Sequence, residues 1–477
     1  MHLLLNETTI ELVDPAADTT LLHWLRESQY LTATKEGCAV GDCGACTVLV
    51  GELEQGKIVY RSVNACIALL GSLNACHVVT LDALQGPKLH PVQQAMVDCH
   101  SSQCGFCSPG FVMSLVVWWL NTPANGLATP AAFAQHRHGV ELALSGNLCR
   151  CTGYLPILLA ADQLAPMDRT AAPLFDQLGG YEKCLKLLQD MASKPRNEAA
   201  QAYLAPSNLV DLALAYEAFP EARLVAGSTD LALDITHGLK TMDRLIDVTG
   251  VEELRSIKQQ GNDIHIGAGV SLSEVECFCQ KDLPLMSDFL GRFASRQVRN
   301  RGTLVGNIAN SSPIADTPPL LLVLDAKLVL LQGQNERTIA LKEFNLGYKQ
   351  TALQAGELIH SVILPLPKIG QRVFVEKVSK RAEDDISATC VAMSITQEQG
   401  LITQINIACG GMAAIPKMAD VTQSHLLGQV LTLELIKKVP VWLAQDYQPI
   451  DDMRASANYR QQVTANLIQG FLQEAIA

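Results

Sequence analysis

The hydrophobic pattern of the first 85 residues predicts a small α+β unit. Residues 2–13 alternate between apolar and polar positions around Asn6, which is typical of a β-hairpin. Asp18 or Thr19 is then expected to cap a helix that continues through Leu25. A Gly/Cys-rich loop follows, and two apolar runs separated by a polar turn predict further strands at 47–50 and 58–61.

Beyond His90 the apolar positions recur with helical spacing, which predicts helices at 92–99, 109–120 and 130–145. Residues 164–202 have little strand pattern and predict a linker with one helix around 181–191. Short strands then alternate with helical segments and glycine-rich turns, with strands expected at 223–226, 264–268, 327–331 and 361–364. The last hundred residues predict strands at 388–396 and 405–410, followed by helices.

Length and composition limit the possible classes of protein. A chain of 477 residues exceeds the roughly 250–300 residues that one core supports, so two to four domains are expected. A hydrophobic content of 48% excludes wholesale disorder, and a net charge of −12 argues against a nucleic-acid partner. The first residues lack the basic segment of a signal peptide, and no apolar run reaches the ~20 residues of a membrane span. These features predict a cytoplasmic protein without a membrane partner.

The cysteines are concentrated near the N-terminus, where ten of the fifteen fall within the first 151 residues. In a reducing compartment, clustered cysteines more often bind metal than form disulfides. Eight of the ten belong to two spaced motifs. The other cysteines of the chain are expected to be small buried hydrophobes: Cys76, Cys99, Cys184, Cys277, Cys279, Cys390 and Cys409.

The first motif is C-x4-C-x2-C, formed by Cys38, Cys43 and Cys46, with Cys66 twenty residues further on. This is the spacing of the plant-type 2Fe–2S ligand set. Glycines at 37, 41 and 44 allow the unusual dihedral angles that a loop around a cluster needs. Zinc and inert buried thiols are the alternatives, but zinc sites favour two C-x2-C pairs. The motif therefore favours a 2Fe–2S cluster.

The second motif pairs Cys104 and Cys107 with Cys149 and Cys151 across two predicted helices. By spacing alone, zinc and a second 2Fe–2S cluster are equally compatible with these pairs. The redox centre expected next to them favours the cluster. His136 and His138, between the pairs, are expected to lie in a solvated loop.

Two downstream segments have the composition of loops that bind phosphorylated ligands. In residues 224–233 an apolar strand leads into a Gly-Ser-Thr-Asp turn, without the glycine spacing of a Rossmann fingerprint. Residues 299–319 offer glycines, Asn307 and several hydroxyls beside apolar positions. The first segment alone is a weak signal, and the second alone is equally compatible with an ordinary polar loop. Together, after two iron–sulfur motifs, they favour an organic redox cofactor.

The order of these motifs resembles the xanthine dehydrogenase family of molybdenum hydroxylases over essentially the whole chain. The resemblance rests on EGCAVGDCGACTV, QCGFCSPGFVMS, GNLCRCTGY, LVAGSTDL, VGNIANSSPIAD and the RAEDD that begins at Arg381. The family's eukaryotic members continue into molybdenum-cofactor domains beyond this point. The resemblance therefore implies the separate iron–sulfur/FAD subunit of a bacterial xanthine dehydrogenase.

The resemblance implies a multi-domain α+β fold. Its parts would be a β-grasp, plant-type 2Fe–2S ferredoxin domain at 1–85, an all-α helical-bundle 2Fe–2S domain at 86–163, a linker at 164–202, an α+β FAD-binding domain of the vanillyl-alcohol-oxidase type at 203–368 and a C-terminal α+β flavoprotein domain at 369–477. The interval between Cys107 and Cys149 is longer than is usual in the family.

The family's site residues carry over onto matching positions. One cluster is implied on Cys38, Cys43, Cys46 and Cys66, and a second on Cys104, Cys107, Cys149 and Cys151. Gln103 and Cys151 match positions that approach the pterin of the molybdenum cofactor, and Tyr348 matches one close to the nicotinamide nucleotide. Ser228 stands where relatives often have asparagine. The implied FAD contacts are Leu224, Val225, Ala226, Gly227, Ser228, Thr229, Asp230, Leu231, Phe293, Thr303, Gly306, Asn307, Asn310, Ser312, Asp316 and Lys377.

The implied function is electron transfer in a xanthine dehydrogenase. Electrons would pass from the molybdenum cofactor of a large partner subunit through two 2Fe–2S clusters to FAD and then NAD+, in a heterotetramer or larger assembly. No catalytic acid or base is expected in this chain. The alternatives are a related molybdenum hydroxylase for aldehydes or other N-heterocycles, a stand-alone iron–sulfur flavoprotein diaphorase, and a zinc-stabilised interaction scaffold.

Overall fold

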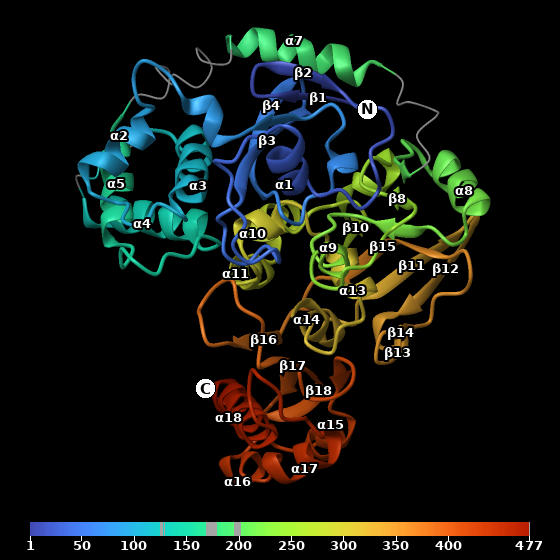
Figure 1. Cartoon of the computed structure of the whole chain (residues 1–477). Coiled ribbons are helices and arrows are strands. Elements are labelled where there is room, and N and C mark those ends of the chain that lie inside the picture. The colour runs from blue at the N-terminus through green and yellow to red at the C-terminus, as the bar shows by residue number, and fades with distance from the viewer. Residues whose placement is uncertain (125–126, 128, 168–178, 195–201, 477) are drawn as a thin grey trace. The chain divides into compact units, whose positions relative to one another are not determined.

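A computed structural model describes residues 1–124, 127, 129–167, 179–194 and 202–476 (Figure 1). The chain divides into two compact units. Unit 1 comprises Met1–Pro206, Glu221–Asp247 and Ala294–Gly302, and unit 2 comprises Ser207–Pro220, Val248–Phe293 and Thr303–Ala477. Both units therefore contain parts of the 203–368 segment. Within the described residues, no helix has the length and apolarity needed to cross a bilayer.

Unit 1 begins with a five-stranded sheet in the order β2-β1-β5-β3-β4. Its β1–β2 hairpin confirms the expected one, with Asn6 at a φ of 52° in the turn. The N-cap of the first helix is Thr20, not Asp18 or Thr19, because the Thr20 hydroxyl accepts the His23 N–H. The elements are β1 (His2–Leu5), β2 (Thr8–Glu11), α1 (Leu21–His23) with a π-turn (Trp24–Ser28), β3 (Thr47–Glu54), β4 (Lys57–Asn64), 3-10 turns (Leu70–Leu73, Leu81–Leu84) and β5 (His77–Val79).

Both faces of this sheet are buried, and strand alternation sends side chains to two different cores. Leu3 and Leu5 of β1 pack with α1, whereas Leu4 between them packs with the helices on the opposite face. Val48 and Leu49 of β3 divide in the same way. The sheet thereby lies between two cores, one shared with α1 and one shared with the helices that follow residue 90.

The helical part of unit 1 confirms the expected helices. They are α2 (Pro91–Asp98), α3 (Ser108–Asn121), α4 (Pro130–Leu144) and α7 (Tyr181–Ala192). A further helix, α5 (Leu155–Leu164), was not expected from the sequence. Helix α7 lies in the expected linker, but it packs along the sheet near β1 (Figure 1). Its Cys184, Leu188 and Met191 are buried in the core that contains α3, so this helix is part of the packed domain.

His136 and His138 lie in α4, so the solvated loop predicted for them was wrong. The His136 ring contacts Trp118 edge-on, and its Nε2 lies 2.9 Å from Asp162 Oδ1 in α5. His138 is exposed on the helix. Two of the cysteines expected to be buried are not: Cys277 is exposed and Cys99 is half-buried.

The remainder of unit 1 is a parallel three-stranded sheet in the order β6-β8-β7 with two short helices. Tyr203 of β6 donates its hydroxyl to Asp247 of β8 at 2.7 Å. The elements are β6 (Tyr203–Leu204), β7 (Arg223–Val225), α9 (Leu231–Thr236), β8 (Leu245–Asp247) and α12 (Arg296–Arg299).

Unit 2 contains an antiparallel five-stranded sheet in the order β12-β11-β15-β10-β9. The expected strands at 264–268, 327–331 and 361–364 are β10, β11 and β15 of this sheet. The elements up to β15 are α8 (Leu209–Ala218), a 3-10 turn (Glu252–Arg255), β9 (Ile257–Gln260), β10 (Asp263–Gly267), α10 (Leu272–Asp282), α11 (Pro284–Gly291), α13 (Leu304–Ala309), α14 (Thr317–Val323), β11 (Lys327–Gln332), β12 (Asn335–Ala340), a 3-10 turn (Leu341–Glu343), β13 (Asn345–Gly347), β14 (Gln350–Thr351) and β15 (Leu358–Pro365).

Unit 2 ends in an antiparallel sheet, β16-β17-β18-β19, whose core includes α15, α17 and α18 (Figure 1). Helix α14 packs on β17 and β18 as well. The elements are β16 (Gln371–Val378), β17 (Thr389–Glu398), β18 (Leu401–Gly410), β19 (Lys417–Met418), α15 (Asp420–Leu426), α16 (Leu433–Ile436), α17 (Val439–Asp446) and α18 (Ala457–Ile476).

Candidate functional site: two cysteine clusters and two loops

The first cysteine motif forms one group of four thiols in unit 1. The Cys38 thiol contacts those of Cys43 and Cys66, and Cys66 also contacts Cys46. Hydrogen bonds from Cys43 and Cys66 lower the pKa of the Cys38 thiol, and the Cys43 N–H also points at Cys38 Sγ from 3.3 Å. The contact with Cys38 raises the pKa of Cys43 and of Cys66. One sulfur of the group is therefore favoured as a thiolate while its neighbours act as donors.

The loop around this group requires glycine at two positions. A Cβ on Gly37 would lie 2.8 Å from Cys43 Sγ. Gly44 has a φ of 67°, and a Cβ there would lie 2.1 Å from the Gly146 carbonyl oxygen. The backbone thus approaches both the thiols and the helical part more closely than other residues permit.

The second motif forms a group that is open at one side. Cys107 contacts Cys149, and Cys104 contacts Cys151, with Cys104 and Cys151 exposed. Burial raises the pKa of Cys107 to about 12. Burial also opposes ionisation of Cys149, but hydrogen bonds from the hydroxyl and N–H of Thr152 outweigh it and lower the pKa.

The donor sets match the chemistry of 2Fe–2S clusters, which four cysteine thiolates hold. In each group the thiols meet in pairs, and paired thiolates suit a site with two irons. Within the described residues, no group of three or more His, Cys, Asp or Glu side chains is arranged to hold a single metal ion.

A buried polar bridge joins the two cysteine loops inside unit 1. The Leu148 N–H donates to the Cys43 carbonyl at 3.0 Å. Next to it, Asn147 Nδ2 donates to the Gly44 carbonyl at 3.1 Å, and Asn147 Oδ1 accepts from Ser114 at 2.7 Å and from Gln297 at 3.1 Å. Asn147, Ser114 and Gln297 are each no more than 2% exposed. The sequence did not reveal this bridge, because Gln297 and Asn147 are separated by 150 positions in the chain.

The first flavin-type loop, 224–231, belongs to unit 1. Ser228 has a φ of 60° and is 5% exposed, and its hydroxyl donates to the Ile67 carbonyl at 2.7 Å. A Cβ on Gly227 would lie 1.8 Å from the Arg301 carbonyl oxygen. Thr229 and Asp230 remain at least partly exposed in the turn. The Ser228 hydroxyl thus lies beside the residue that follows Cys66, and it is equally close to the Gly227 carbonyl, at 2.7 Å.

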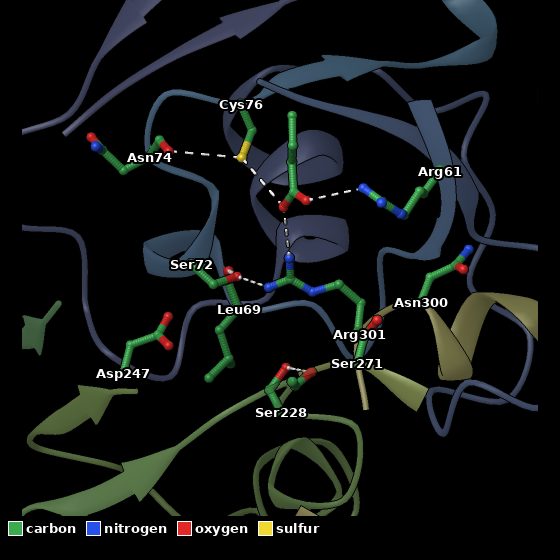
Figure 2. A network of polar contacts seen from close by, with 12 residues as sticks. Arg61, Leu69, Ser72, Asn74, Cys76, Ser228, Asp247, Ser271, Asn300 and Arg301 are labelled. Atoms are coloured by element: carbon green, nitrogen blue, oxygen red, sulfur yellow. Dashed lines mark hydrogen bonds and ion pairs between the residues drawn. The ribbon is translucent and has the colours of Figure 1, made fainter. Parts of the chain in front are cut away.

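Arg301 anchors the segment that lies against Gly227. Its guanidinium donates to Ser72 Oγ at 2.7 Å and to Glu52 Oε1 at 3.4 Å, and Arg61 contacts the other oxygen of Glu52 at 3.5 Å (Figure 2). The neighbouring Asn300 donates to the Ser62 carbonyl at 2.9 Å. Residues 294–302 are therefore fixed to the five-stranded sheet by charged and amide side chains.

In unit 2 the predicted residues Asp316 and Lys377 form a buried ion pair. Lys377 Nζ lies 2.8 Å from Asp316 Oδ2, with side chains 1% and 8% exposed. Lys377 also donates to the Arg292 carbonyl at 3.2 Å, and Ser387 donates to the other Asp316 oxygen. Ser387 was missed from the sequence, and its place just after the RAEDD motif was the only available signal.

The second loop begins at the N-cap of α13, where Thr303 Oγ1 accepts the Gly306 N–H at 2.9 Å. Asn307 Oδ1 accepts the Thr317 hydroxyl at 2.6 Å, which ties the loop to α14. Phe293 is half-buried directly after α11, and Tyr348 is 62% exposed between β13 and β14. Asn310 and Ser312 are half-buried along the same loop.

Models of four protein families match successive parts of the chain. They are a 2Fe-2S iron-sulfur cluster binding domain at 3–71, a [2Fe-2S] binding domain at 80–162, the FAD binding domain in molybdopterin dehydrogenase at 197–367 and the CO dehydrogenase flavoprotein C-terminal domain at 375–475. The chain is thus a multi-domain α+β protein with two 2Fe–2S domains, an FAD-binding domain and a C-terminal flavoprotein domain.

Curated relatives and solved structures agree with these models. Xanthine dehydrogenase/oxidase of Rattus norvegicus is 30% identical over 91% of this chain and 36% of its own length, and xanthine dehydrogenase of Drosophila subobscura is 29% identical over 89% and 35%. The chain therefore spans about a third of these relatives. A structure of carbon monoxide dehydrogenase from Hydrogenophaga pseudoflava matches with a TM-score of 0.53 and 26% identity, covering 56% of this chain and 94% of that one. The chain belongs to the xanthine dehydrogenase family of molybdenum hydroxylases and carries that family's iron–sulfur and FAD-binding domains.

Proposed function

We propose that this chain is the electron-transfer portion of a xanthine dehydrogenase. It would carry electrons from the molybdenum cofactor of a large partner subunit through two 2Fe–2S clusters to FAD and then NAD+. The observation that carries the proposal is the gathering of eight cysteines into two groups of four thiols within unit 1. Iron–sulfur clusters exchange single electrons, whereas a flavin exchanges either single electrons or a hydride. Two clusters and FAD together would therefore connect one-electron transfer to two-electron chemistry.

In the first group, Cys38, Cys43, Cys46 and Cys66 are the proposed cluster ligands. Cys46 and Cys66 are 1% and 2% exposed, so the protein excludes water from one side of the site. Asn64 Nδ2 donates to the Gly41 carbonyl at 2.6 Å and holds the loop closed. These residues would keep the thiolates in place without bulk water, which is one of the factors that set a cluster's potential.

In the second group, Cys104, Cys107, Cys149 and Cys151 are the proposed ligands, and their exposed side is the proposed docking face for the molybdenum subunit. Apolar side chains are exposed on the same segments, namely Phe106 at 47%, Tyr154 at 38%, Leu155 at 59% and Leu159 at 43%. Gln103 is exposed beside them. Exposed apolar groups around a polar site are typical of a surface that another protein covers.

The proposed FAD contacts are the two flavin-type loops, Phe293 and Lys377. Residues 224–231 of the first loop, and Thr303, Gly306, Asn307, Asn310, Ser312 and Asp316 of the second, would hold the phosphates and ribose. Phe293 would stack on the flavin ring, and the ammonium of Lys377, fixed by Asp316, would lie near that ring. Tyr348, exposed at a turn, is the proposed contact for the nicotinamide nucleotide.

Reconstitution with the large subunit tests the proposal. The purified complex should contain four irons and one FAD for each copy of this chain, elute as a heterotetramer or larger, and form NADH when xanthine is added. NADH formation from an aldehyde or another N-heterocycle but not xanthine would assign a related hydroxylase. Full NADH-oxidising activity of the lone chain would assign a diaphorase, and zinc without visible absorption would assign a structural scaffold.

The ligand assignment has its own test. Replacing Cys43→Ser should remove the EPR signal of one cluster and leave the other, because Cys43 contacts only thiols of the first group. Cys76→Ser is the matched control, since Cys76 is a buried cysteine in the same core as Cys46 and Cys66 that lies outside both groups. Unchanged iron content in Cys43→Ser would contradict the assignment.

A further inference from the structure

Helix α9 joins the first flavin-type loop directly to the loop of the first cysteine group. The helix follows residues 224–231, and its C-terminal end meets the Cys38 loop. Thr236 Oγ1 donates to the Ala39 carbonyl at 2.7 Å, and His237 Nε2 donates to the Cys38 carbonyl at 3.0 Å. These contacts join positions separated by 197 and 199 residues in the chain.

The start of the same segment is tied to the other side of the cysteine group. The Ser228 hydroxyl donates to the carbonyl of Ile67, the residue after Cys66. Between the two ends, Ala232 of α9 is fully buried in the core of the ferredoxin-like part. The turn and the helix are therefore hydrogen-bonded, one at each end of the segment, to backbone carbonyls at or next to cysteines of the first group.

The Cys38 loop depends on such outside partners. Residues 34–46 form no helix or strand, so their carbonyls lack the regular partners of secondary structure. Ala39 has a φ of 56°, a left-handed conformation that is strained for a residue with a Cβ and persists only where its surroundings hold it. The hydrogen bonds from Thr236 and His237 satisfy two carbonyls at this strained point.

We propose that α9 couples occupancy of the first cluster site to binding of FAD, with Thr236 and His237 as positioning residues. The proposal rests on the function proposed above. Thiolates that hold a cluster fix the backbone of Cys38 and Ala39. That backbone fixes the end of α9, and the helix fixes the turn at 227–230. When the cluster has already ordered this segment, FAD no longer loses binding free energy in ordering it. The cluster should therefore raise the affinity for FAD, and FAD should raise the affinity for the cluster by the same factor.

A double-mutant cycle on the full chain tests the coupling. FAD dissociation constants are measured by flavin fluorescence with and without the substitution Cys43→Ser. In the otherwise unchanged chain, loss of the cluster should weaken FAD binding roughly tenfold, within the usual range of coupling between sites. In a Thr236→Val/His237→Leu background, the same Cys43→Ser substitution should change the affinity less than about twofold.

Two further variants separate this effect from damage to the fold. Thr236→Ser/His237→Gln keeps both donors and should restore the coupling, whereas Lys240→Ala removes only the exposed ion pair of Lys240 with Asp234 and should leave it intact. The EPR signal of the second cluster reports folding of unit 1 in each variant. Equal effects of Cys43→Ser in all backgrounds would overturn the inference, while absence of iron and flavin from the unchanged chain would overturn the proposed function instead.

Discussion

Asn147 is the residue whose removal should most directly loosen the connection between the two cysteine groups. Its side chain accepts from Ser114 and Gln297 and donates to the Gly44 carbonyl, at 2.7, 3.1 and 3.1 Å. The residue is 2% exposed, so water cannot replace these partners. Three buried hydrogen bonds at about 1 kcal/mol each make the expected loss about 3 kcal/mol for Asn147→Ala.

Asn121→Ala provides the matched control. Asn121 lies at the C-terminal end of α3 and donates to the Tyr60 carbonyl at 3.0 Å. It also links the helical part to the sheet, but by a single, partly buried hydrogen bond. Its loss should cost only about 1 kcal/mol.

The assay is guanidinium unfolding of the full chain, followed by visible absorption of the clusters and by far-UV circular dichroism. Asn147→Ala should lower the midpoint of cluster loss clearly more than Asn121→Ala, and the two clusters should be lost together. Equal midpoints for the two variants would refute the reasoning, because they would show that the buried bridge contributes no more than an ordinary amide contact.

Three further perturbations follow from buried groups. Burial lowers the pKa of His77 to about 4, so below pH 6.5 the unfolded chain takes up a proton that the folded chain does not. The free energy of unfolding should therefore fall by up to ~3 kcal/mol as the pH drops from about 6.5 to about 4. The unfolding midpoint of His77→Gln should depend less on pH. Lys377→Met leaves Asp316 buried without its cation and should cost about 3–5 kcal/mol in thermal unfolding, with partial recovery in Lys377→Met/Asp316→Asn; a double variant as unstable as the single one would contradict the pair's role. Phe293→Ala should loosen FAD, and full flavin retention on dialysis with normal NAD+ reduction would count against the stacking role.

Much of the local structure was predicted from the hydrophobic periodicity and from the positions of turn and helix-capping residues. The hairpin around Asn6, the helices α2–α4 and the strands β10, β11 and β15 lie where the pattern predicted them. The prediction failed where a tertiary contact decides the environment. His136 was expected in solvent, but Asp162 and Trp118 of neighbouring helices enclose it. Cys277 was expected in a core, but it lies on the outer side of α10.

The sequence by itself determined which thiols of a single loop lie together. Cys38, Cys43 and Cys46 meet because residues a few positions apart are confined by the chain itself. Cys66 joins them, and Cys149 and Cys151 join Cys104 and Cys107, only through the fold. Only the tertiary structure decided which distant groups meet those loops. Gln297 reaches Asn147, Thr236 and His237 reach the Cys38 loop, and Ser387 reaches Asp316. Such contacts arise when buried faces pack together. The position of a polar residue in the sequence does not reveal which distant residue packing will place next to it.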